Sequence, residues 1–169
     1  MKQDLGFYDY WPYENRPKIQ WPGGAKLAFW VAPNIEYYEL DPPQNSFRKA
    51  WPQPTPAVAG YSIRDYGNRV GHSRQMELLD KYGIRGSVSL STALCDHHPE
   101  IIKQCRDLNW EFFSHGIYNT RYTYGMTEDQ EREMIRDSIK SIFKHTNQKC
   151  AGYLAPALSH SELTLDLFA

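Results

Sequence analysis

The chain has 169 residues, of which 41% are hydrophobic and 14% aromatic, so length and composition fit one folded domain rather than a disordered segment. Its formal net charge is −1, and its basic residues form no run of like charge. This argues against a nucleic acid or an anionic membrane surface as the main partner, because both bind a clustered basic face.

The cysteines and the N-terminus indicate a cytoplasmic protein. Cys95, Cys105 and Cys150 are widely spaced and odd in number, so they suggest reduced thiols and not a disulfide framework. The first 17 residues contain no apolar segment of a secretory signal, and no apolar run approaches membrane-spanning length. We therefore expect a cytoplasmic protein without a membrane segment.

The pattern of apolar residues predicts four strands, each followed by a helix. The predicted strands are 26–33, 85–91, 110–113 and 150–155, and the predicted helices are 69–82, 99–108, 127–143 and one that begins at 161. Gly83 followed by Ile84 is a typical helix end. Thr127 and Gln130 fit a capping box. Residues 1–25 are expected to form an N-terminal arm, and 37–66 a long loop after the first strand.

This alternation of strands and helices predicts a parallel sheet with helices packed outside it. The longer polar segments follow the strands, and ligands bind at the carboxyl ends of strands in such folds. Four units are half of a closed barrel, which has about 250 residues. We therefore expect either a shortened product or a chain that covers its open sheet edge with a partner, such as a homo-oligomer.

Four polar side chains lie where the active face is expected. Glu36 follows the first strand, as a general base or as a solvated loop carboxylate. His115 follows the third strand, as an acid or base, a metal ligand, or a histidine bonded to the backbone. Asn119 stands four residues later, where a metal site would have a second histidine. Asn34 and Asn119 either bind a substrate amide or serve as turn residues.

The long loop is rich in aromatic residues. They are Tyr37, Tyr38, Trp51, Tyr61 and Tyr66. Such side chains can stack on a sugar or a heterocycle as a lid. The alternative is that they pack the loop onto the sheet or form a subunit contact.

Four stretches of sequence carry a resemblance to a known family. They are PGGAKLAFWV followed by Asn-Ile-Glu, DYGNRVGHSRQMELLDKYGIRGSVSLST, WEFFSHGIYNTR with TEDQEREMIR, and GYLAPALS. Together they resemble the polysaccharide deacetylase (NodB-like) superfamily, and its allantoinase-like, metal-independent branch above all. The resemblance extends from about residue 21 to the end. It implies that residues 1–169 are one partial domain, the parallel (β/α) half of a distorted NodB-type barrel. It also implies hydrolysis of carbon–nitrogen bonds that are not peptide bonds.

The chain departs from the family pattern at each of its motifs. The usual pair of aspartates is replaced by Asn34 and Glu36, and the usual histidine pair by His115 and Asn119. The usual arginine before proline is absent from the stretch LAP, 154–156. The resemblance still implies Glu36 and His115 as catalytic residues. It implies four substrate-binding residues, Asn34, Tyr37, Asn119 and Pro156.

These departures bear on the cofactor. A catalytic zinc needs three protein ligands, and asparagine is a poor replacement for imidazole. Glu36 and His115 supply only two, so we expect no required metal, or a weakly bound divalent metal such as zinc at these two residues.

The sequence thus leads to two hypotheses about function. In the first, the protein hydrolyses a small amide, a ureide or an N-acetylated sugar in carbohydrate metabolism. Glu36, with a pKa raised by burial, would activate water, and His115 would polarise the carbonyl or protonate the leaving nitrogen. In the second, the chain is a truncated, non-catalytic half-barrel that serves as a binding or assembly module.

Overall fold

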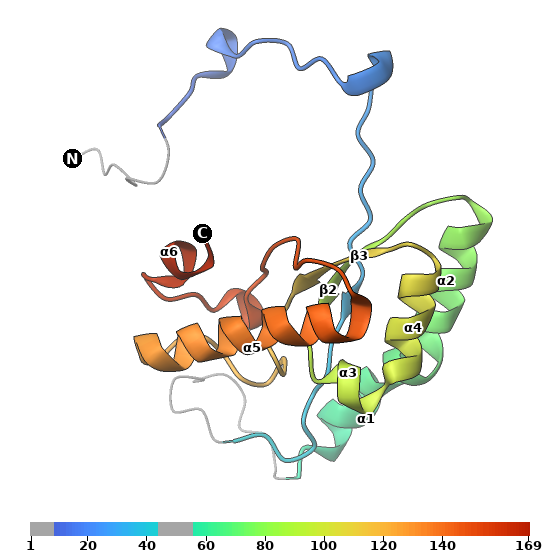
Figure 1. Ribbon diagram of the computed structural model, residues 1–169, viewed down its shortest axis with the longest axis vertical. Coiled ribbons are helices and arrows are strands. Elements are labelled where there is room, and N and C mark those ends of the chain that lie inside the picture. The colour runs from blue at the N-terminus through green and yellow to red at the C-terminus, as the bar shows by residue number, and fades with distance from the viewer. Residues whose placement is uncertain (1–8, 44–55) are drawn as a thin grey trace.

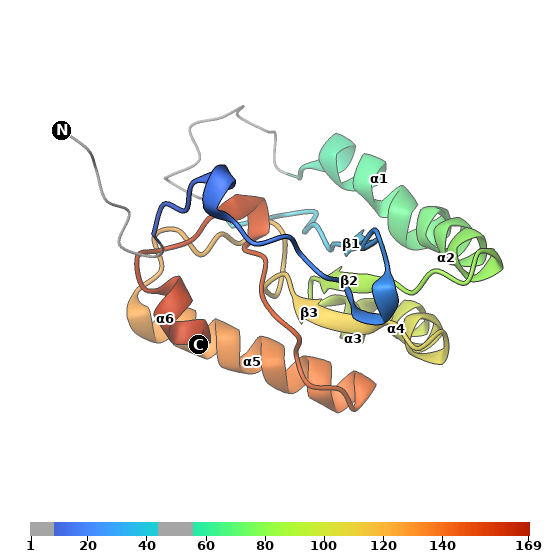
Figure 2. The ribbon, with the colours of Figure 1, turned by 90° about the horizontal axis from the view of Figure 1, so that it is seen from above.

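The fold is a parallel sheet with helices packed around it (Figures 1 and 2). The computed structural model of the protein describes residues 9–43 and 56–169. The sheet has the order β1 (Asn34–Ile35), β2 (Ser87–Leu90) and β3 (Glu111–Ser114), with both pairs parallel. The predicted parallel α/β architecture is confirmed.

The first strand is shorter than the predicted range 26–33. Its ladder starts with one bridge from Val31 to Gly86 and continues in β1, where Asn34 lies opposite Ser89. At this register residues 26–30 would face the end of a helix and its turn, which offer no extended partner. Leu27, Phe29 and Trp30 are consequently exposed. Residues 9–25 run away from the sheet as the expected arm (Figure 1), with 3-10 turns at Tyr13–Asn15 and Pro22–Gly24.

The fourth predicted strand lies in the expected place but forms little ladder. Segment 151–154 runs beside β3, with a single bridge from Tyr153 to Ser114. The Ala151 N–H donates to Phe112 O at 2.9 Å, and the Leu154 N–H donates to Ser114 O at 2.9 Å. Pro156 ends this pairing because it has no N–H to donate. The Leu154 carbonyl consequently lies beside His115, directly after the end of β3.

One long helix follows the loop after β1. It consists of α1 (Val58–Tyr66), a π-helical turn (Gly67–Gly71) and α2 (His72–Lys81). The predicted helix 69–82 is therefore too short, and the predicted loop 37–66 ends in helix. Glycine has a low helix propensity, so the glycines of this stretch conceal the helix in the sequence. Residues 44–55, which include Trp51, lie outside the described residues.

The remaining helices surround the sheet as the sequence indicates. They are α3 (Leu94–His97), α4 (Pro99–Asp107), α5 (Glu128–Thr146) and the short α6 (Thr164–Phe168). Helix α5 lies along β3 and contacts α4 and α6. The predicted capping box of Thr127 and Gln130 begins α5. The predicted stop ends α2, where Gly83 has a φ of 65°. In the described part of the chain, no helix is long and apolar enough to cross a lipid bilayer.

Trp110 closes the core at the start of β3. Its side chain is 1% exposed and lies directly over Gly86, at the start of β2. A Cβ atom at position 86 would lie 2.7 Å from a ring carbon of Trp110, well inside van der Waals contact. The core around this contact is formed by Ile35, Met76, Val88, Leu90, Leu94, Cys95, Ile101, Ile102, Cys105, Phe112 and Ile142.

We expect Gly86→Ala to destabilise the fold by about 1–3 kcal/mol, because the added methyl group must displace the buried indole. Urea denaturation followed by tryptophan fluorescence measures the change. Gly152→Ala is the matched control, since a Cβ there meets only the Phe113 Cβ within 4 Å, at 3.9 Å. Equal stability of the two variants would contradict the proposed packing.

Candidate active site

Polar side chains from three strand ends line one pocket of about 280 Å³. It lies at the carboxyl ends of β1, β3 and the bridged segment 151–154, which is where ligands bind in parallel α/β folds. The lining consists of Asn34, Glu36, Tyr38, Arg64, His115, Asn119, Tyr122, Leu154, Ala155, Ala157 and Leu158. All four residues that the sequence motifs single out thus line this pocket: Asn34, Glu36, His115 and Asn119.

The His115 ring is held between a carbonyl and a carboxylate. Its Nδ1 atom lies 2.7 Å from Leu154 O, and its Nε2 atom lies 3.2 Å from Glu36 Oε1. A backbone carbonyl only accepts hydrogen bonds, so Nδ1 carries a proton. The carboxylate also accepts, so the contact between Nε2 and Oε1 is an ion pair only when Nε2 is protonated as well. In that state Nε2 carries the proton that the two side chains can share.

The Glu36 carboxylate accepts further hydrogen bonds. Its Oε2 atom accepts from the Tyr38 hydroxyl at 3.0 Å and from Asn119 Nδ2 at 3.1 Å. Burial raises the pKa of Glu36, but the hydrogen bonds from His115 and Tyr38 and the charges of His115 and Arg64 outweigh it. The net effect lowers the pKa of Glu36 below its ordinary value. The expected raised pKa is therefore wrong, because sequence reasoning counted burial and not the donors.

The two loops that bring Glu36 and Asn119 together are bonded to each other. The Asn119 N–H donates to Tyr37 O at 2.9 Å. The Arg121 guanidinium binds the Glu39 carboxylate through two N–H groups, at 2.6 and 3.1 Å. Glu39 also accepts from the Thr120 hydroxyl at 2.6 Å. These bonds hold the segment after β1 against the loop after β3, so the carboxylate and the amide meet in a defined geometry.

The Asn119 side chain hydrogen-bonds Glu36, so its N–H group is not directed at a ligand. Its Nδ2 group donates to Glu36 and to the Tyr38 hydroxyl. Its Oδ1 atom is buried and has no hydrogen-bond partner among the described residues. Asn34 differs, because its side chain is exposed at the end of β1 within the pocket. A substrate amide would therefore meet Asn34 more readily.

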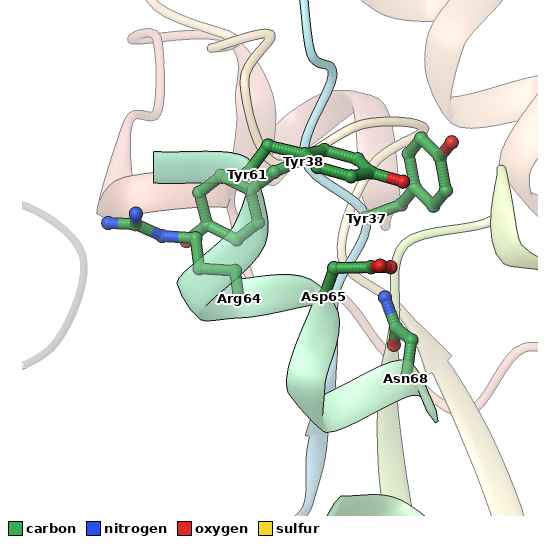
Figure 3. A pocket seen from close by; sticks show the side chains of 6 residues that line it. All are labelled: Tyr37, Tyr38, Tyr61, Arg64, Asp65 and Asn68. Carbon is green, nitrogen blue, oxygen red and sulfur yellow. The ribbon is translucent and has the colours of Figure 1, made fainter. Parts of the chain in front are cut away.

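Tyr37 and Pro156 lie elsewhere than the resemblance implies. Tyr37 points away from Tyr38 (Figure 3) and stacks on the His97 ring, with the ring centroids 4.2 Å apart. Successive side chains of an extended segment point to opposite sides, so Tyr38 enters the pocket in place of Tyr37. Pro156 is buried against Gly116, where a Cβ atom would lie 2.9 Å from its Cγ. It supports the turn after His115 and does not line the pocket.

A small polar cluster supports the segment from behind (Figure 3). It is formed by side chains of Tyr37, Tyr38, Tyr61, Arg64, Asp65 and Asn68. Asn68, from the π-helical turn, donates its Nδ2 hydrogen to Glu36 O at 3.1 Å. Asp65 is buried and pairs with Arg69 one turn later. Tyr37 stacks on His97 and, with Tyr61 of α1, lines this cluster, whereas neither lines the pocket at the strand ends.

Two exposed residues that line the pocket have unusual backbone angles. Ala157 and Leu158 have φ values of 51° and 56°, in the left-handed region that non-glycine residues rarely adopt. The Ser159 hydroxyl holds this turn by donating to Pro156 O at 2.6 Å and accepting from the Thr123 N–H at 3.1 Å. Neither glycine nor asparagine marks the turn, so the sequence contains no signal for it.

The donor set does not suit the divalent metal of the family pattern. Within residues 9–43 and 56–169, no group of three or more His, Cys, Asp or Glu side chains could hold a metal ion. The Nε2 atom of His115, its one free ring nitrogen, already faces Glu36. Asn119 directs its N–H group, which cannot bind a cation, at the same carboxylate. We therefore derive no chemical step through a metal.

Comparisons with known proteins agree with this architecture. Residues 59–169 match the family model named Polysaccharide deacetylase. PuuE allantoinase has a TM-score of 0.71 at 22% identity, over 95% of this chain and 57% of its own. A Pseudomonas aeruginosa PAO1 protein described as a probable polysaccharide deacetylase has a TM-score of 0.71 at 24% identity, over 99% and 57%.

A third neighbour is less similar. A Bacillus anthracis protein described as a CE4 family pseudoenzyme has a TM-score of 0.58 at 18% identity, over 82% of this chain and 38% of its own. At these identities the three structures show the fold. The chain spans 38 to 57% of their lengths. A comparison of the sequence with curated proteins gave no significant match.

The family model covers more than half of the chain, and the neighbours share its parallel sheet. The resemblance drawn from the sequence motifs is thus confirmed, and the fold is part of a NodB-type barrel. The chain belongs to the polysaccharide deacetylase family.

Proposed function

We propose that the protein hydrolyses a carbon–nitrogen bond other than a peptide bond, with Glu36 and His115 as its acid–base pair. The observation that supports this most is the distance of 3.2 Å between Nε2 and Oε1, together with the bond from Nδ1 to Leu154 O. A histidine oriented by one acceptor and paired with a carboxylate can move a proton at a defined atom. The substrate would be a small amide, a ureide or an N-acetylated sugar.

In the proposed reaction the substrate carbonyl lies beside Glu36, with its amide bound by Asn34. The Glu36 carboxylate takes one proton from a water molecule as the water oxygen attacks the carbonyl carbon. The His115 imidazolium gives its Nε2 proton to the leaving nitrogen, and the carbon–nitrogen bond breaks. Glu36 then passes its proton across to Nε2, which restores the starting pair.

The remaining site residues would position this pair. Tyr38 and Asn119 hold Oε2 of Glu36, and Asn68 holds its carbonyl, so Oε1 stays directed at His115. Such preorganisation lowers the cost of charge movement during the reaction. The lowered pKa makes Glu36 a weak base, so in this scheme the attack on the carbonyl depends on protonation of the leaving group by His115.

A second candidate function is binding without catalysis. It is favoured by the fold shared with a protein described as a pseudoenzyme, and by Leu154 and Ala155 in place of the arginine of the family pattern. In this case the pocket would bind an amide ligand with no turnover. Stoichiometric binding by a pure preparation that shows no hydrolysis would favour this second function.

We further propose that the protein is cytoplasmic and self-associates. The free thiols of Cys95, Cys105 and Cys150 suit a reducing compartment. The exposed Leu27, Phe29 and Trp30 beside the unpaired edge of β1 suit a contact between copies. Cell fractionation and sedimentation velocity would check the two statements in turn.

We expect Glu36→Gln and His115→Ala each to reduce kcat/KM for an amide substrate by roughly 100-fold or more, because general acid–base steps contribute this much. Initial rates on N-acetylglucosamine and on a small ureide measure the effect. Glu133→Gln and His160→Ala are matched controls, since both side chains are exposed outside the pocket and should leave the rate unchanged. Hydrolysis at the wild-type rate in both site variants would refute the proposal.

The activity should persist to acid pH. The folded pKa of Glu36 lies below its ordinary value of 4.5, so the carboxylate remains ionised until the pH falls through that lower value. The stability that the ionised form contributes is present above pH 4.5 and is lost over the same range. Tyr38→Phe removes one donor and should move the acid limb of kcat/KM to higher pH, whereas Tyr37→Phe should not. A limb that is identical in wild type and Tyr38→Phe would contradict the role of this hydroxyl.

Chelation should leave the rate within about twofold of its starting value, because His115 and Glu36 bind each other and offer no third ligand. The measurement is the initial rate before and after dialysis against EDTA, with metal analysis of the same preparation. A loss of activity that zinc or cobalt restores would show that the site rearranges to bind a metal.

A further inference from the structure

Arg64 lines the pocket from α1, within the range 37–66 that the sequence predicts to be a loop. It lies in the last turn of α1, and its Cζ atom lies 4.4 Å from the centroid of the Tyr38 ring. Its Nη1 group donates to Gly60 O at 3.1 Å. Figure 3 shows its guanidinium directed away from Asp65 and Asn68. Two independent contacts therefore fix the plane of this cation at the edge of the pocket.

The charge of Arg64 has no carboxylate partner in the part of the chain that the structure describes. Its helical neighbour Asp65 pairs with Arg69, and Glu36 pairs with His115. The Glu36–His115 contact is a neutral pair when the ring is protonated. Arg64 places a fixed positive charge at the edge of the pocket, near enough to Glu36 to help lower the pKa of that carboxyl.

The arrangement also leaves hydrogen-bond donors available. A guanidinium has five N–H groups in one plane, and stacking on an aromatic ring occupies its face and not its edge. One N–H group donates to Gly60 O, and the Arg64 side chain also hydrogen-bonds Tyr38. Of the five N–H groups, donors are thus left for a ligand, and guanidinium binds a planar anion through a pair of parallel N–H groups. A carboxylate matches such a pair of donors in geometry and charge. A phosphate dianion would need a second cation, which the lining of the pocket lacks.

We propose that Arg64 binds a carboxylate of the substrate, which makes the substrate a small amide or ureide with a free carboxylate group. This inference rests on the proposed hydrolysis, because it assigns the reacting carbonyl to Glu36 and His115 and the carboxylate to Arg64. The pocket volume of about 280 Å³ suits a small molecule rather than a length of polymer. A protonated His115 compensates the negative charge of Glu36, which reduces the repulsion of an anion bound at Arg64.

The test compares two probes that differ only in charge, N-carbamoylglycine and its neutral amide N-carbamoylglycinamide. Isothermal titration at pH 7 measures Kd for both. We expect the wild-type protein to prefer the carboxylate by about tenfold, as one charge-assisted pair of hydrogen bonds allows. The preference should fall to about one in Arg64→Gln and should be partly retained in Arg64→Lys, which keeps the charge without the planar edge.

Arg136→Gln is the control for net charge, because Arg136 is exposed on α5 outside the pocket. It should keep the tenfold preference. Absence of measurable carboxylate binding, equal affinity for both probes in wild type, or a preference that persists in Arg64→Gln would overturn the assignment.

The same variants separate this inference from the proposed function. If Glu36→Gln and His115→Ala hydrolyse amides at the wild-type rate while Arg64→Gln loses the preference, the anion site stands and the acid–base pair does not. If hydrolysis depends on Glu36 and His115 while the preference is unaffected by Arg64→Gln, the pair stands and the carboxylate assignment is wrong.

Discussion

The hydrogen bond from His115 Nδ1 to Leu154 O is the constraint on which the rest of the site depends. At 2.7 Å it joins the end of β3 to the neighbouring segment and determines which ring nitrogen is protonated. With that nitrogen used, only Nε2 is left to face the pocket. Whatever lies opposite Nε2 must share a proton with it, and the fold places Glu36 there. The tautomer of one histidine thus decides the chemistry of its partner.

The surroundings of Glu36 follow from the same constraint. A carboxylate removed from water must be paired and hydrogen-bonded, or it loses its charge. Here the imidazole supplies one donor, and Tyr38 and Asn119 supply the others. Asn119 occupies the position at which the family pattern has a second histidine. Its N–H group makes it a partner for an anion rather than for a cation, so one substitution converts a ligand of metal into a support for Glu36.

Bonds between loops maintain this geometry within the described residues. The ion pair of Glu39 with Arg121 and the backbone bond from Asn119 to Tyr37 connect the ends of β1 and β3. The π-helical turn adds Asn68 from the other side. Interruptions of this kind in helices are frequent at functional sites. The described part of the chain therefore holds Glu36 against His115, whereas Leu27, Phe29 and Trp30 are exposed.

The sequence by itself determined the order of elements and the family, and it indicated Glu36 and His115 as candidates for the site. Short-range patterns encode these features: the cap at Thr127, the stop at Gly83, and polar residues placed after apolar runs. The long helix of α1, the π-helical turn and α2 does not follow from the sequence pattern, because the low helix propensity of Gly60, Gly67 and Gly71 is overridden by tertiary packing. The choice of Tyr38 over Tyr37, the lowered pKa of Glu36 and the entry of Arg64 were decided only by the tertiary structure. Each depends on side chains from separate segments meeting at one point, and no local pattern records such a meeting.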